Sequence, residues 1–254
     1  DNREENFSRE TLNEMGELGI LGSFIEGYDC AGANYVSYGL IAREIERLDS
    51  GYRSLMSVQS SLVMLPIYKF GTEEQRQKYL PKLAKGKIIG SFGLTEPDAG
   101  SDPGSMKTKA KKVKDGYIIN GAKTWISNAV EGGILAILAK TDPEAEPRHK
   151  GMSLFLVEKS SEFKVNKRMK KLGYKGIDSG EFVMEDLFVP GENLIGGAEG
   201  RGLQQILGGL ELGRINVAAR GVGIAKACLL KSVEYSQMRK TFGKPICEHQ
   251  SIQI

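Results

Sequence analysis

The run Gly93-Leu94-Thr95-Glu96-Pro97-Asp98-Ala99-Gly100-Ser101-Asp102 decides the fold of this chain. It follows an apolar segment at 88–92 that is typical of a strand, and its Pro, Gly, Ser and Asp residues predict a loop. Hydroxyl groups and glycine-exposed backbone can together meet one polar, planar ligand there. A second run, Lys123-Thr124-Trp125-Ile126-Ser127-Asn128, ends a later strand with one aromatic ring and one hydroxyl.

Both runs resemble the flavin-binding segments of the acyl-CoA dehydrogenase family. The resemblance implies non-covalent FAD, held by the matching positions Phe92, Leu94, Thr95, Gly100, Ser101, Trp125, Ile126 and Ser127. In the family the first loop contacts the flavin ring and phosphates, the Trp flanks the ring, and a residue at the Ser127 position lies near N5. For Trp125, the only Trp of the chain, a place in the core is the alternative.

Composition excludes several other function classes. The 254 residues carry 35 basic and 32 acidic side chains, so the net charge of +3 does not indicate a nucleic-acid partner. Three scattered cysteines and two histidines favour reduced thiols and neither a metal site nor a His-based triad. We see no secretion signal and no membrane-spanning run, so we expect a cytoplasmic or mitochondrial-matrix protein.

The residue pattern divides the chain into three parts and predicts an α+β multidomain fold. Apolar stripes and a capping box at Thr72 predict a helical domain over 1–88. Turn dipeptides at Asp115-Gly116 and Asn120-Gly121, between short apolar runs, predict a small barrel or sandwich, and we expect a β-barrel domain over 89–199. A helical pattern over 200–254 predicts the start of a C-terminal helical bundle. The resemblance implies the same order, with both helical domains incomplete here.

The family reaction needs a base for the α-proton of the substrate, and a carboxylate usually supplies it. In most of the family, this Glu lies in a C-terminal part that this sequence does not contain. Some members place it directly before an Arg, but here the run Leu210-Glu211-Leu212-Gly213-Arg214 has glycine at that position. We therefore expect no catalytic base among these residues.

A third segment, 239–245, resembles the part of the family that reaches the FAD of a neighbouring subunit. Its planar guanidinium at Arg239 suits a pyrophosphate, although a solvated basic cluster is the alternative. The positions that match this interface are Arg239, Thr241, Phe242 and Gln250. The resemblance therefore implies a homotetramer, and it implies an electron-transfer flavoprotein as the redox partner.

The segment 46–64 is similar to the glutaryl-CoA dehydrogenase branch of the family. There, an Arg at the Arg53 position faces the acyl end and a Glu at the Glu46 position accompanies it. A dicarboxylate ends in a charge, and a buried charge needs a partner. The implied substrate-binding residues are Glu46, Arg53, Ser54, Ser101 and Arg214. The alternative for Arg53 is a surface ion pair in the first turn of a helix.

The segments 171–176 and 209–216 look more like the short- and medium-chain branch, so a monocarboxylic acyl-CoA stays open as the substrate. An acyl-CoA oxidase is a second enzyme class, because it differs only in letting oxygen reach the reduced flavin. A non-catalytic relative that binds DNA should carry a basic patch, and the balanced charge argues against it.

Overall fold

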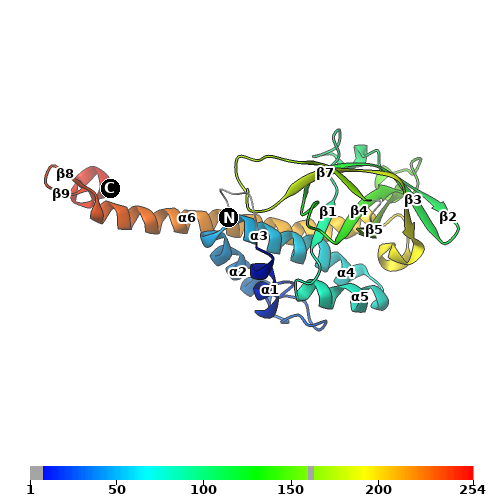
Figure 1. The fold of residues 1–254 in the computed structure, drawn as a ribbon, viewed down its shortest axis with the longest axis horizontal. Helices are drawn as coiled ribbons and strands as arrows, with labels where there is room; N and C mark the ends of the chain where they lie inside the picture. The colour runs from blue at the N-terminus through cyan, green and yellow to red at the C-terminus, as the bar shows by residue number, and fades with distance from the viewer. Residues whose placement is uncertain (1–7, 160–162, 254) are drawn as a thin grey trace.

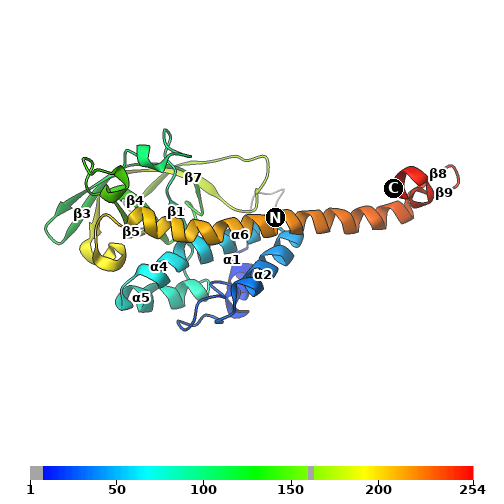
Figure 2. The same ribbon diagram turned by 180° about the vertical axis from the view of Figure 1, so that it is seen from behind.

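The computed structural model describes residues 8–159 and 163–253. A helical layer lies against one face of a curled sheet, and one long helix runs along both and projects beyond them (Figures 1 and 2). The helices are α1 (Arg9–Glu17), α2 (Tyr35–Leu48), α3 (Ser50–Ser57), α4 (Leu65–Phe70), α5 (Glu73–Ala84), α6 (Gly202–Met238) and α7 (Gln250–Gln253). The strands are β1 (Gly90–Gly93), β2 (Lys109–Val113), β3 (Gly116–Ser127), β4 (Ile134–Lys140), β5 (Met152–Glu158), β6 (Lys164–Arg168), β7 (Ser179–Pro190), β8 (Lys240–Thr241) and β9 (Lys244–Pro245).

Local capping signals start the helices where the sequence predicts them. The Thr72 hydroxyl accepts the Gln75 amide while the Gln75 side chain accepts the Thr72 amide, so α5 begins with the predicted capping box. The Asp49 carboxylate accepts the Tyr52 amide and starts α3. Helix α3 then continues into a π-helical turn over Val58–Met64 before α4 begins.

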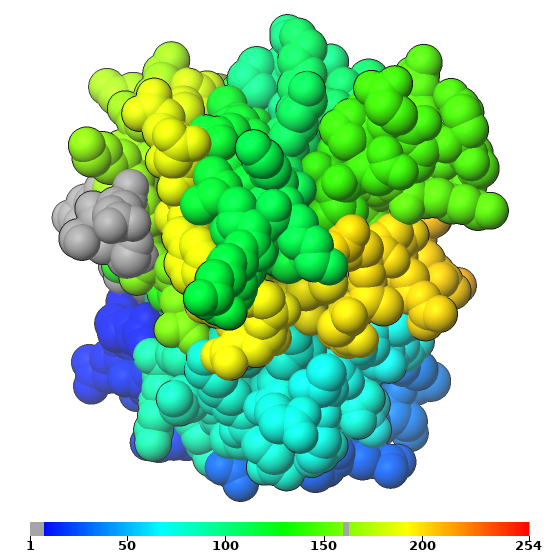
Figure 3. Space-filling model, turned by 90° about the vertical axis from the view of Figure 1, so that its right-hand side faces the viewer, coloured from blue at the N-terminus to red at the C-terminus, as the bar shows by residue number. Residues whose placement is uncertain are grey.

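The central strands separate two hydrophobic cores. Strands β4 and β5 are buried along almost their whole length, as their unbroken apolar runs predict. Because side chains alternate along a strand, Ala136 and Leu138 pack toward the helices while Leu135 and Ile137 pack inside the curl of the sheet. The space-filling view from the sheet end shows the helical layer below and the sheet above (Figure 3).

The predicted β-barrel is only partly formed, as an open, curled sheet. The seven strands pair in the order β1-β4-β2-β3-β7-β6, with β5 against β4. Within the described ranges β5 and β6 each have one neighbouring strand, so the sheet curls without closing. The number and spacing of strands indicated a barrel, but closure depends on tilt and register between distant strands, which no local pattern encodes.

Helix α6 approaches the helical layer closely through two glycines. A Cβ on Gly209 would lie 2.8 Å from the Ser61 carbonyl oxygen, and one on Gly223 would lie 2.6 Å from the Arg43 carbonyl oxygen. Larger residues there would force the helices apart. Beyond Gly223 no residue of α6 is buried, and this end carries β8, β9 and α7 away from the sheet (Figure 1).

None of the helices in the described part of the chain has the length and hydropathy needed to span a bilayer.

Candidate active site

A buried ion pair shapes the loop that follows β1. The Lys123 ammonium, which is fully buried, donates to the Glu96 carboxylate at 2.9 Å and to the Leu94 carbonyl at 3.2 Å. Glu96 also accepts the backbone amides of Lys107 and Thr108 at 2.6 and 3.1 Å. The loop is thereby tied to β3 and to the start of β2. Glu96 and Lys123 lie in the two motif runs at 93–102 and 123–128, but no local pattern indicates that they pair.

Burial and charge act against each other at this pair. Burial lowers the pKa of Lys123, and the nearby Glu96 carboxylate only partly offsets this effect. Burial alone would raise the pKa of Glu96, but Lys123 and the donated hydrogen bonds outweigh it and hold the pKa below its usual value. Each group thus offsets part of the cost of burying the charge of the other.

Trp125 stands out from the sheet beside this loop. Its indole is 57% exposed, while the neighbouring Thr124 and Ile126 are buried. The register between β3 and β7 shifts between Lys123 and Ile126, and Trp125 adopts a left-handed backbone with φ of 59°. Such a bulge redirects a side chain. The Thr124 amide donates to the Thr95 carbonyl at 3.0 Å, which holds this part of β3 against the loop at 93–102. The alternative of a core tryptophan is therefore wrong.

The remaining residues predicted for the flavin lie around the same loop. Phe92 and Leu94 are partly buried against the helical core. Gly100 and Ser101 are exposed on the outer part of the loop. The Ile126 side chain belongs to the core inside the sheet, and the residue as a whole is 2% exposed.

One cavity of about 440 Å³ brings most of the predicted substrate residues together. It lies between α3, α6, the end of β3 and the loop before β7. Leu210, Gly213, Arg214 and Val217 line it from one face of α6, as their helical spacing allows. Glu211 does not line it. The full lining is Arg53, Ser54, Ser57, Val58, Leu62, Ser127, Lys171, Gly173, Tyr174, Ile177, Ser179, Leu210, Gly213, Arg214, Val217 and Arg220.

Charge is unevenly distributed over this cavity. Its lining includes four basic side chains and, among the residues that the structure describes, no Asp or Glu. Five aliphatic side chains line it as well. Sequence reasoning predicted Arg53, Ser54, Ser127 and Arg214 but missed Ser57, Lys171, Tyr174 and Arg220. No local motif marks these four residues. Arg220 could still have been identified from helical spacing, because Val217 is four residues after Gly213 and Arg220 is three residues after Val217.

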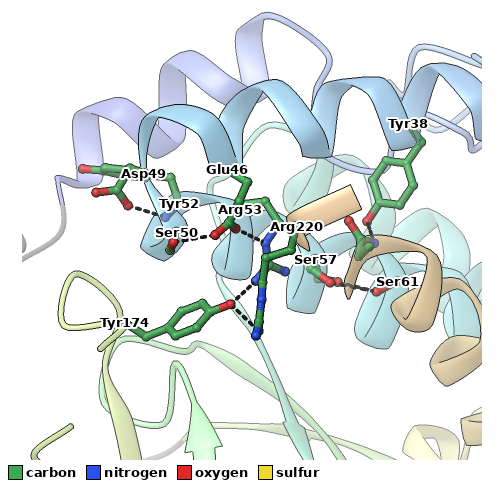
Figure 4. A network of polar contacts seen from close by, with 11 residues as sticks. Tyr38, Glu46, Asp49, Ser50, Tyr52, Arg53, Ser57, Ser61, Tyr174 and Arg220 are labelled. Carbon is green, nitrogen blue, oxygen red and sulfur yellow. Dashed lines mark hydrogen bonds and ion pairs between the residues drawn. The ribbon is translucent and has the colours of Figure 1, made fainter. Parts of the chain in front are cut away.

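Glu46 and Arg53 form the predicted pair, but deep inside the protein. The Arg53 Nε donates to Glu46 at 2.7 Å, and the exposed fractions of the two side chains are 5% and 0%. Glu46 also accepts the Ser50 hydroxyl, and Arg53 Nη2 donates to the Tyr174 hydroxyl oxygen at 2.7 Å (Figure 4). The alternative of a surface ion pair for Arg53 is therefore wrong. Ser101, by contrast, does not line the cavity.

The positions predicted to serve a neighbouring subunit lie far from this cavity, at the projecting end of α6 (Figure 1). Arg239 follows the last residue of α6, and Phe242 is 98% exposed. The Thr241 hydroxyl lies 3.0 Å from the His249 ring, and Gln250 begins α7. Within this chain they form a separate group.

Among the described residues, no cluster of three or more His, Cys, Asp or Glu is arranged to hold a metal ion.

Comparison with known proteins gives a consistent result. The sequence matches the family models for the N-terminal, middle and C-terminal domains of acyl-CoA dehydrogenase over residues 1–87, 91–187 and 200–254. An acyl-CoA dehydrogenase of Bacillus subtilis is 41% identical over 248 residues, which make up 97% of this chain and 65% of that protein.

Solved structures agree with the sequence matches. A glutaryl-CoA dehydrogenase of Mycobacterium smegmatis, in complex with FADH2, is 38% identical with a TM-score of 0.92, covering 99% of this chain and 63% of that one. The butyryl-CoA dehydrogenase of Megasphaera elsdenii is 37% identical with a TM-score of 0.93, covering 99% of this chain and 66% of that one. The chain thus spans just under two thirds of the length of these relatives. Since the three family models match in order over almost all its residues, the chain belongs to the acyl-CoA dehydrogenase family.

Proposed function

We propose that the protein containing this chain oxidises a short acyl-CoA thioester with FAD. The observation that carries this proposal is the exposed Trp125 on the strand segment bonded to the Thr95 loop, two residues before Ser127, which lines a mixed basic and aliphatic cavity. The similarity to a glutaryl-CoA dehydrogenase in complex with FADH2 supports the same cofactor.

The residues present fit a flavin. An aromatic face, a hydroxyl at Ser127 and the loop backbone at 92–95 suit a flat ring with a polar edge. When bound, the flavin supplies the hydride acceptor. Ser127 is the only one of these groups that also lines the cavity, so it joins the ring site to the acyl site. Arg239, Thr241, Phe242 and Gln250 are proposed to hold the FAD of a neighbouring subunit in a homotetramer.

The chain's own residues bind and enclose the acyl group. Val58, Leu62 and Leu210 offer an apolar wall that excludes water. None of the described carboxylates lines the cavity, so we propose that the proton acceptor is a carboxylate outside this sequence. The excess of basic side chains favours a dicarboxylic acyl group such as glutaryl. We propose that Arg53, Ser54 and Arg214 line its site, that the buried Glu46 acts through Arg53, and that Ser101 contacts the substrate outside the cavity. A monocarboxylic short-chain substrate is the alternative.

Anaerobic titration of the full-length protein tests this function. We expect a yellow protein whose flavin absorbance bleaches on addition of glutaryl-CoA, with reoxidation by electron-transfer flavoprotein. A protein that stays colourless after incubation with FAD contradicts the cofactor. Peroxide release without turnover by electron-transfer flavoprotein indicates an oxidase, and bleaching by butyryl-CoA alone indicates the monocarboxylic alternative.

Light scattering of the same preparation should give a tetramer, and a stable FAD-saturated monomer contradicts the proposed assembly.

Replacing Trp125 with Ala in the full-length protein should raise the Kd for FAD by roughly two- to tenfold. The reason is the loss of a stacking contact worth about 0.5–1.5 kcal/mol. Equilibrium titration of the FAD-depleted protein measures this change. Phe188→Ala is the matched control, because Phe188 is a 47% exposed aromatic side chain of β7 on the same sheet. Equal losses in both variants would show that Trp125 has no particular contact with the flavin.

A further inference from the structure

Two arginines from distant parts of the chain meet at one tyrosine in the cavity. Arg53 Nη2 and Arg220 Nη1 donate to the hydroxyl oxygen of Tyr174 at 2.7 and 2.6 Å (Figure 4). Their guanidinium carbons lie 5.7 and 5.3 Å from the centre of the Tyr174 ring. Arg53 comes from α3, Arg220 from α6 and Tyr174 from the loop between β6 and β7.

The backbone of Tyr174 is held in an uncommon conformation. Its φ is 55°, in the left-handed region that non-glycine residues seldom occupy. Residues kept in such regions cluster at binding and catalytic sites, where surrounding contacts hold them in place. Here both arginines line the cavity together with Tyr174, so these contacts fix the phenol at its wall.

The charges of the two arginines are balanced differently. Arg53 is paired with the fully buried Glu46, which neutralises it. Arg220 has no carboxylate partner among the described residues, and its only hydrogen bond there joins it to Tyr174. The positive charge of Arg220 is therefore not balanced by a described carboxylate, and an anion beside it would be stabilised by that charge.

The tyrosine also has a hydrogen left to donate. Its oxygen accepts from both arginines, and in the described part of the chain no acceptor receives its own O–H. A phenol both donates and accepts. Arg220 and Tyr174 therefore present unused donors on the wall of a cavity that, among the residues the structure describes, carries four basic side chains and no acidic one. A carboxylate is the ligand that matches a planar guanidinium and a phenol.

We infer that Arg220 and Tyr174 receive the distal carboxylate of a dicarboxylic acyl-CoA, while Arg53, neutralised by Glu46, positions Tyr174. This inference rests on the proposed function. It assigns selectivity to Arg220, a residue outside the resemblance to glutaryl-CoA dehydrogenase. Arg220 binds the charged end of the acyl chain, and the aliphatic lining contacts the methylene groups of that chain.

The test uses the full-length holoenzyme and substrate pairs of equal chain length: succinyl- and butyryl-CoA, glutaryl- and valeryl-CoA, adipyl- and hexanoyl-CoA. Wild-type enzyme should prefer the dicarboxylic member of at least one pair. Arg220→Gln should lower kcat/KM for that member by about 100-fold and change its methyl-ended partner by less than about threefold. Tyr174→Phe keeps the ring and should lower the same value by about tenfold. Lys231→Gln, which removes a charge from an exposed position of α6, should leave the preference unchanged.

The outcomes separate this inference from the proposed function. If none of these acyl-CoA substrates reduces the flavin of the wild-type enzyme, the proposed function itself is contradicted. Wild-type enzyme that prefers the methyl-ended member of every pair overturns the carboxylate assignment but keeps the dehydrogenase. Equal losses on both members of a pair in Arg220→Gln, with FAD still bound, would mean that Arg220 supports the fold or binds the phosphates of CoA. That result also overturns the inference.

Discussion

Replacing Arg53 with Met in the full-length protein is expected to lower its melting temperature by about 6–20 °C. The substitution leaves the fully buried Glu46 without its partner, and breaking a buried ion pair costs about 3–5 kcal/mol. In domains of this size each kcal/mol shifts the melting temperature by about 2–4 °C. Thermal unfolding followed by circular dichroism measures the shift. Loss of activity in an Arg53 variant alone therefore does not show a substrate contact.

The double variant Glu46→Gln/Arg53→Met provides the control. Because it removes both charges, it should regain most of the lost melting temperature. A single and a double variant that are equally destabilised would show that Arg53 acts through packing and not through its charge. Full stability of the single variant would mean that Glu46 reaches water or another cation.

Replacing Lys123 with Met is expected to be as damaging, with a loss of about 3–5 kcal/mol at neutral pH, because it leaves Glu96 buried without a cation. It should also weaken FAD retention, since Lys123 holds the Leu94 carbonyl and Glu96 in the loop proposed to bind flavin. Lys107→Met breaks the exposed Lys107–Asp98 pair on the same loop and should leave the melting temperature nearly unchanged.

The pH dependence distinguishes charge from packing at this site. In the wild type, the pKa of Glu96 lies below its usual value, so its stabilising contribution is present above that usual value and is lost as pH falls through the lowered pKa. Without Lys123, the largest influence that lowers the pKa of Glu96 is gone, so this pKa rises relative to the wild type and the penalty for the buried charge falls as pH falls toward it. The deficit of Lys123→Met should therefore shrink from pH 8 toward pH 5. A deficit that stays constant over this range would assign the effect to lost packing.

Much of the site follows from local sequence patterns. The loop at 93–102 and the strand ending at Ser127 are where the sequence predicts them, because turn residues and apolar runs act over a few positions. The pairing of Glu46 with Arg53 was predicted from the resemblance to glutaryl-CoA dehydrogenase, and the break at Asp49 places the two residues on successive helices. Their burial was left open, because the second half of the chain covers them.

The sequence by itself determined the order of helices and strands, the position of the loop beside Trp125 and the resemblance to a flavoprotein family. Only the tertiary structure decided that the sheet stays open, that Trp125 faces outward and that Lys123 meets Glu96 inside the protein. It also brought Tyr174 to Arg53 and Arg220, across separations of 121 and 46 residues. The physical reason is that local propensity acts over a few residues, whereas contacts between distant segments depend on how whole layers pack.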